Sequence, residues 1–290
     1  MFTKILKSDI KSGTLVKWNV YLVTILLFSA FSLLCYLERR AIEFVSPELA
    51  SAPSTLGDYL FFVFSGSSTG EFDNAGIVGG LIHGRINIQM PTTWMIFMLW
   101  VLFTTLYYPY HELMGIGKHM LILTKQKVIW WTSKCVWVMI NAISHIYIAV
   151  LSVSVSAICF GATLDLSVSP YLVYNTVSDF SKMQIEPWNM LHTLLLLAPI
   201  GAALSVLQLF FSLVFSPIYG YILMIGYVLL SSYISSPIFI CNYSAAARSI
   251  DFVINGMRFE NGIVTAVFAI STAMLIGYLI FSRIDILNKE

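Results

Sequence analysis

The sequence predicts an all-helical, polytopic membrane protein, and three observations carry that prediction. Hydrophobic residues make up 58% of the 290 residues and charged residues only 11%, whereas about 25% of an ordinary soluble domain is charged. The mean hydropathy is +0.82. Charged residues are also absent from several stretches of about 20 residues or more, the length that a helix needs to cross a bilayer core of roughly 30 Å. These properties exclude a soluble enzyme and a disordered chain.

The charge-free stretches divide the chain into six predicted spans. The first span lies between Lys17 and Glu38. The fourth and fifth share one long uncharged stretch, which Ser216-Pro217 interrupts because proline lacks the amide hydrogen of a continuing helix. We expect helices over residues 18–37, 91–110, 136–160, 190–214, 217–240 and 262–282.

Lysine and arginine are biased towards one set of connecting segments. If the N-terminus is cytoplasmic, ten of the 16 basic residues fall in inner segments, and basic residues favour the cytoplasmic side. We therefore expect both termini inside, an outer loop over residues 38–90 and an inner loop over 111–134. Cys135 should then be cytoplasmic, and Cys241 should lie near the outer face. The whole chain, 1–290, is expected to form one transmembrane domain.

No catalytic or metal-binding signature has the required spacing. His111-Glu112 begins like the zinc motif HExxH, but Gly115 stands where the second histidine is needed. Gly117-Lys118 resembles the end of a phosphate loop, but His119 replaces the required Ser or Thr. The four cysteines show no CxxC spacing, and 16 basic against 15 acidic residues give no positive field for nucleic acid. We expect no catalytic, metal or cofactor site on this chain and no nucleic-acid partner.

The inner loop is the segment richest in interfacial residues. It carries lysines among apolar residues and contains, near its end, Trp130-Trp131, aromatic residues of the kind that lie at headgroup level. Basic loops flanked by such aromatics are common in polytopic proteins. These features alone therefore fit a structural and a functional role equally well.

A series of short motifs is concentrated in residues 90–135 and, less completely, in 205–250. They are Pro91-Thr92-Thr93-Trp94, Tyr107-Tyr108-Pro109, Glu112-Leu113, Gly115, Leu123-Thr124, Trp130-Trp131, Lys134, Leu207-Gln208, Ser212-Leu213, Ser216-Pro217, Asn242-Tyr243 and Arg248. Together they resemble the permease subunits of type-2 ATP-binding-cassette (ABC) transporters, above all six-span permeases of Gram-positive bacteria linked with peptide export or self-protection against antimicrobial peptides. One departure is Thr124-Lys125-Gln126-Lys127, where that group carries arginines, because lysine lacks the bidentate fork.

The resemblance implies a transport subunit without an active site of its own. A separate ATPase subunit would bind ATP and Mg²⁺, and the chain would pair with a second copy or a sister permease in the lipid membrane. The exported molecule would be amphipathic, an antimicrobial peptide or a lipid-like compound. In such permeases a short cytoplasmic helix docks on the ATPase. The docking candidates in this chain are Glu112, Leu113, Met114, Lys118, Leu121, Leu123, Lys125 and Lys127.

Two further sets of residues are candidates for contact with the transported molecule. Short polar stripes in the predicted spans contain Ser152, Ser156, Ser232 and Ser236. Such residues either line a path or hydrogen-bond between packed helices. In the outer loop, Glu71 and Asp73 follow the apolar run 59–64 and could attract a cationic peptide. The alternative for this loop is a segment that caps the outer ends of the helices.

Two other functions stay open. A secondary transporter should carry ionisable residues at membrane depth or inverted repeats, and the sequence offers only His145 and His192 in or near spans. A non-transporting immunity or sensor protein, which binds a ligand at its outer loops, fits the spans as well as a transporter does.

Overall fold

The computed structural model describes residues 2–45, 53–67, 91–115, 117, 121, 127–176, 183–184 and 187–283. Throughout these ranges the regular secondary structure is helical, joined by a few isolated β-bridges and without a β-strand. The all-helical class predicted from composition is therefore confirmed.

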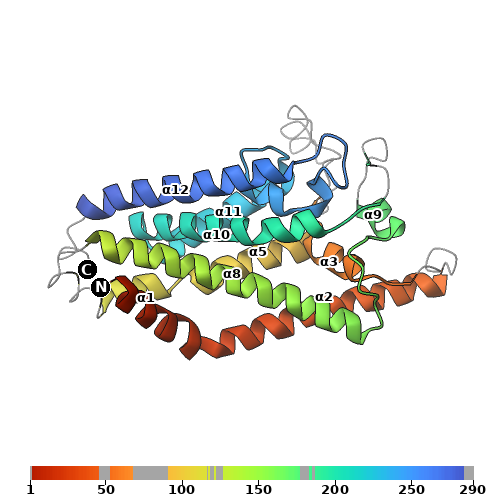
Figure 1. Cartoon of the computed structure of the whole chain (residues 1–290), viewed down its shortest axis with the longest axis horizontal. Helices are drawn as coiled ribbons and strands as arrows, with labels where there is room; N and C mark the ends of the chain where they lie inside the picture. The colour runs from red at the N-terminus through yellow and green to blue at the C-terminus, as the bar shows by residue number, and fades with distance from the viewer. Residues whose placement is uncertain are drawn as a thin grey trace.

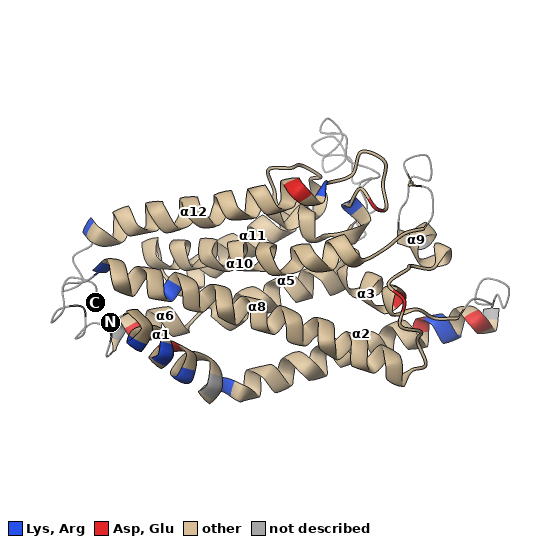
Figure 2. Ribbon diagram, in the orientation of Figure 1, with Lys and Arg blue, Asp and Glu red and all other residues tan. Residues whose placement is uncertain are grey.

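Four helices are long and apolar enough to cross a membrane. They are α2 (Trp18–Val45), α8 (Lys127–Cys159), α10 (Leu191–Val214) and α12 (Phe259–Arg283). Even α10, with 24 residues, is about 36 Å long, more than the roughly 30 Å of a bilayer core. These helices lie lengthwise in one bundle (Figure 1), and charged residues gather towards its two ends (Figure 2). They correspond to the first, third, fourth and sixth predicted spans.

The helices in the second and fifth predicted spans are shorter than expected. α5 (Thr92–Thr105) ends before a bend that leads into α6 (Tyr108–Met114). α11 (Pro217–Tyr233) ends seven residues before the predicted limit at residue 240. A longer α11 is disfavoured because the ring of Pro237 would clash with the carbonyl of Tyr233, four residues earlier in a continuing helix. The chain instead runs through the short 3₁₀ helices η4 (Ile240–Ser244) and η5 (Ala246–Arg248).

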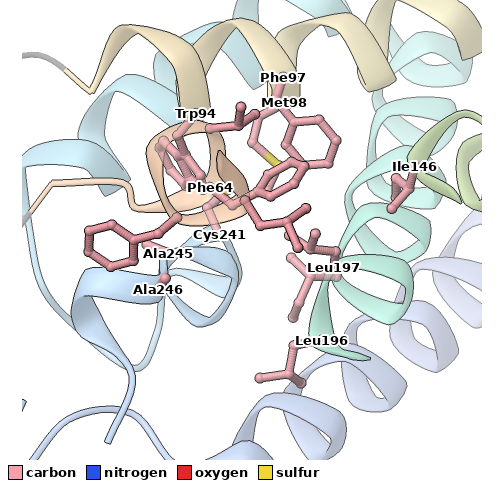
Figure 3. Packing of buried hydrophobic residues seen from close by; sticks show 14 of the residues in the cluster. Phe64, Trp94, Phe97, Met98, Ile146, Leu196, Leu197, Cys241, Ala245 and Ala246 are labelled. Atoms are coloured by element: carbon pink, nitrogen blue, oxygen red, sulfur yellow. The ribbon is translucent and has the colours of Figure 1, made fainter. Parts of the chain in front are cut away.

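The apolar run 59–64 lies inside the protein and not on its surface. It belongs to α3 (Leu56–Phe64), where Tyr59, Phe61 and Phe64 are among the buried residues. The helix begins with a capping box between Thr55 and Asp58. Phe64 packs edge-to-face on Phe97 of α5, with 4.8 Å between the ring centroids, and Figure 3 shows this contact within an apolar cluster. This run therefore offers no exposed strip to a peptide, and Glu71 and Asp73 lie outside the described residues.

Small residues allow the central helices to approach closely. α10 packs against α5, α8, α11 and α12. A Cβ added at Gly201 of α10 would lie 2.3 Å from Cδ1 of Ile146 in α8. On α12, a Cβ at Gly277 would lie 2.2 Å from the Trp131 ring, whose Nε1 donates to the carbonyl of Met274 at 2.9 Å. These contacts fit the small-residue interfaces that membrane helices use in place of a hydrophobic driving force.

Two exposed positions allow a test of the predicted orientation, because α1 (Phe2–Asp9) and the C-terminal end of α12 lie at the same end of the bundle (Figure 1). Cys135 and Cys241 are buried, whereas Cys159 at the end of α8 is exposed. We expect an impermeant thiol reagent added to intact cells to label a variant with Cys159 alone. It should spare a variant whose single cysteine is Ser8→Cys. Permeabilised cells should label both, and labelling of Ser8→Cys from outside would contradict a cytoplasmic N-terminus.

Candidate functional site

Lys134 is a buried cation at which α1, α6 and α8 meet. Its Nζ lies 2.5 Å from Oδ1 of Asp9 at the end of α1 and also pairs with Glu112 of α6. Two hydroxyls complete the cluster: Tyr108 donates to Oδ1 of Asp9 at 3.1 Å, and Ser133 donates to Oδ2 at 3.0 Å. We call these five residues the inner ionic cluster.

Local helix geometry brings the inner ionic cluster together. Ile5 and Asp9 are one helical turn apart and form the buried face of α1. Trp130 and Lys134 are likewise one turn apart on α8, and Nζ of Lys134 lies 5.4 Å from the Trp130 ring centroid. The ammonium is thus held by two carboxylates and by an aromatic face, which attracts a cation through its quadrupole.

Glu112 links this cluster to α6 through its pairing with Lys134. Burial raises the pKa of Glu112, while Lys134 and the nearby Trp130 indole N–H act in the opposite direction. The indole lies outside hydrogen-bond geometry, so Lys134 is the principal partner of Glu112. A movement of α6 would therefore disturb Lys134 and, through it, α8 and α1.

The structure describes five of the eight docking candidates. Leu113 in α6 and Leu121 are 5% and 4% exposed, respectively, so both side chains pack inside the chain. Glu112 also has its partner, Lys134, inside the chain. Lys127 begins α8 and donates to the carbonyl of Ser282 at 3.0 Å. Met114 is the last residue of α6. The remaining candidates, Lys118, Leu123 and Lys125, lie outside the described residues.

Arg248 is a second buried cation and lies at the C-terminal end of α11. Its guanidinium donates to the carbonyls of Ser231 and Ser232, to both the carbonyl and the hydroxyl of Ser67, and to Oδ1 of Asn242. The last carbonyls of a helix lack intrahelical donors and carry partial negative charge. Arg248 thus supplies the donors that the missing continuation of α11 would have supplied.

The serines predicted to line a path make contacts typical of helix packing. Ser152 donates to the carbonyl of Ile25 at 2.8 Å and lies 2.9 Å from the hydroxyl of Ser29, both in α2. The Ser232 hydroxyl bonds back to Leu229 within α11. Ser236 offers its carbonyl to Asn242 at 2.9 Å, and Ser156 is half-buried on α8. These contacts accord with the packing alternative.

His145 belongs to the same contact between α2 and α8. Its Nδ1 lies 3.0 Å from the hydroxyl of Thr24, and its ring stacks on Tyr21 with 4.2 Å between centroids. Thr24 also accepts a hydrogen bond from the indole of Trp100 at 2.9 Å. His145 is therefore part of a polar joint between three helices.

Asp58 holds the opposite end of the bundle together. It is 1% exposed and pairs with Arg39 of α2 at 3.3 Å. The backbone N–H and the hydroxyl of Ser169 donate to its carboxylate at 2.7 and 2.6 Å. This carboxylate therefore ties α3 both to α2 and to the segment that precedes α9 (Pro170–Thr176).

A pocket between α6, α8 and α10, lined in part by Leu113, Trp130 and Ser212, has a volume of about 10 Å³, about enough for one water. Within the described ranges, no group of three His, Cys, Asp or Glu side chains could hold a metal ion. Comparison of the chain with protein-family models, curated proteins and solved structures finds no match.

Removal of the Lys134 charge should be strongly destabilising, because it leaves Asp9 and Glu112 buried without a cation. We expect Lys134→Met to lower the free energy of unfolding by about 3–5 kcal/mol. The measurement is unfolding by sodium dodecyl sulfate in mixed micelles, followed by circular dichroism. Arg258→Met, at an exposed site, is the matched control and should change it by less than about 0.5 kcal/mol. Equal effects of the two variants would contradict the role given to Lys134.

Arg248→Lys should also be destabilising although the charge is kept, since lysine has three donors on a single nitrogen and arginine has five. Each buried carbonyl left without a donor costs about 1–3 kcal/mol. We expect a loss of at least that size in the same unfolding measurement. Arg258→Lys, at an exposed site near the same end, should have almost no effect. If Arg248→Lys leaves the free energy of unfolding unchanged, the carbonyls around this side chain do not need the guanidinium geometry.

Proposed function

We propose that this chain is the permease subunit of an ABC exporter, paired with a second permease and driven by a separate ATPase. The observation that carries the proposal is the position of α6. This short helix joins α5 to the segment leading into α8, and the inner ionic cluster couples it to α8 and α1. The motifs in residues 90–135 that resemble type-2 ABC permeases surround the same helix.

The proposal takes α5 and α11 as two further crossings, which gives six spans with both termini in the cytoplasm of a bacterial cell. α5 has 14 residues and α11 has 17, so the helices cover about 21 and 26 Å. α5 leads into α6, which contacts α10, and α11 leads through residues 234–239 into the buried residues 240–248, which contact α10 and α12. Irregular backbone at membrane depth is tolerated where protein covers it, which supports counting these short helices as spans.

The proposal also divides the docking candidates between two roles. Leu113 and Leu121 are buried within the chain, so we assign them to holding the inner loop against the bundle. We assign Lys118 and Lys125 to ion pairs with the ATPase, which would bind ATP and Mg²⁺. Force from nucleotide-driven closure would then pass from the loop to α6 and, through Glu112 and Lys134, to α8.

The transported molecule in this proposal is amphipathic, with an antimicrobial peptide as the first candidate and a lipid-like molecule as the second. The low charge of the chain supports this class, because the spans offer few fixed charges to a strongly polar solute. An immunity or sensor protein without transport would share the apolar spans but would need no ATPase partner. The presence of that partner therefore separates the two functions.

Purification of the tagged chain from its host membrane tests the proposal. We expect an ATP-hydrolysing subunit to copurify, and Lys118→Glu/Lys125→Glu to reduce its yield several-fold. The reduction is modest because an exposed ion pair contributes only about 0–1 kcal/mol. Arg40→Glu, at an exposed residue of α2, is the control and should leave the yield unchanged. Absence of any ATPase from the wild-type preparation would contradict the transporter and favour the immunity or sensor protein.

A further inference from the structure

The N-terminal segment, residues 2–18, has an exposed surface that is basic throughout its described part. Its exposed charged side chains are Lys4, Lys7, Lys11 and Lys17. Its single acid, Asp9, is 1% exposed and paired with Lys134. Figure 2 shows the basic residues along α1 and the turns that follow it. The inner ionic cluster thus removes from this surface the one charge that would oppose an anion.

The buried face of α1 fixes the direction in which the lysines point. Ile5 and Asp9 face α8, and Lys4 and Lys7 lie three residues apart on a different face of the helix. The segment therefore has an anchored side and a cationic side, and the anchor does not depend on the lysines.

The segment also lies at the level where lipid headgroups are found. It ends at Trp18, the first residue of the apolar helix α2. Trp18 is 60% exposed and Val16 is 68% exposed, a combination of aromatic, apolar and cationic groups that favours the interface between water and hydrocarbon. Since α2 enters the bilayer at this point, lysines within a few turns of Trp18 must lie close to phosphate groups.

We propose that Lys4, Lys7 and Lys11, with Lys17, form a binding surface for anionic phospholipid headgroups. The occupant follows from charge complementarity and from position: the surface is cationic, lies beside the membrane entry of α2, and is exposed in the isolated chain. Lysines near an anionic membrane surface attract it additively. Anionic lipid at this surface would hold α1 against the bundle and so stabilise the docking of Asp9 on Lys134.

Lipid titration of the full chain in detergent, followed by native mass spectrometry, tests this proposal. The probes are phosphatidylglycerol and phosphatidylcholine with identical acyl chains. We expect Lys4→Gln/Lys7→Gln to weaken phosphatidylglycerol binding about 25-fold, at about fivefold for each lysine, and to leave phosphatidylcholine binding unchanged. Arg40→Gln/Arg258→Gln removes the same charge from other exposed sites and should leave both affinities unchanged.

Two further arms keep the result interpretable. Lys4→Arg/Lys7→Arg keeps the charge and should bind like wild type, so a loss confined to the glutamine variant is not a folding defect. In about 1 M salt, where the Debye length is about 3 Å, wild type should lose its preference for phosphatidylglycerol. The proposal would be overturned if Lys4→Gln/Lys7→Gln bound phosphatidylglycerol as tightly as wild type. It would also be overturned if Arg40→Gln/Arg258→Gln lost as much affinity as that variant. Displacement of the lipid by millimolar inorganic phosphate would also overturn it, in favour of a site for free phosphate.

Discussion

Hydrocarbon gives no hydrogen bond to a carbonyl and no solvation to a charge, so a charged group buried inside this bundle needs its partners within the chain. The three buried ionic groups show how the chain meets that demand. Lys134 has two carboxylates, Arg248 has helix carbonyls and an amide oxygen, and Asp58 has a guanidinium and a serine. Each joins segments far apart in sequence, because no single helix supplies enough partners.

The same demand explains why two of the helices can be short. A helix that stops inside a membrane leaves its last carbonyls without donors. α11 stops at Tyr233 and its last turn receives Arg248 instead. The later part of the irregular segment, residues 240–248, is buried, with Asn242, Ser244 and Ala246 among its inaccessible residues. Arg248 thus supplies hydrogen-bond donors in place of the N–H groups of a further helical turn.

The amino-acid sequence predicted the spanning helices well because the absence of charge over about 20 residues is a strong local signal. Pro237 is a local signal for the early end of α11. The prediction instead followed the uncharged stretch, which continues past this proline. Almost no local signal predicted the burial of Asp9, since its partner Lys134 is 125 residues away. Both residues resembled ordinary charges of the inner segments. The burial of α3 was missed because Glu71 and Asp73 follow it and made the surrounding segment look like a surface loop.

The burial of α3 also has a consequence for biosynthesis. The backbone N–H of Leu56 donates to Thr163, Asp58 accepts from Ser169, and Ser67 accepts from Arg248, 181 residues further along the chain. The ribosome adds about 5–20 residues per second, so α3 waits on the order of ten seconds or more for its last partner. During that interval the apolar side chains of α3 must contact something else that excludes water, such as lipid or the insertion machinery. The end of the bundle that contains α3 is therefore completed only after most of the C-terminal third of the chain has been made.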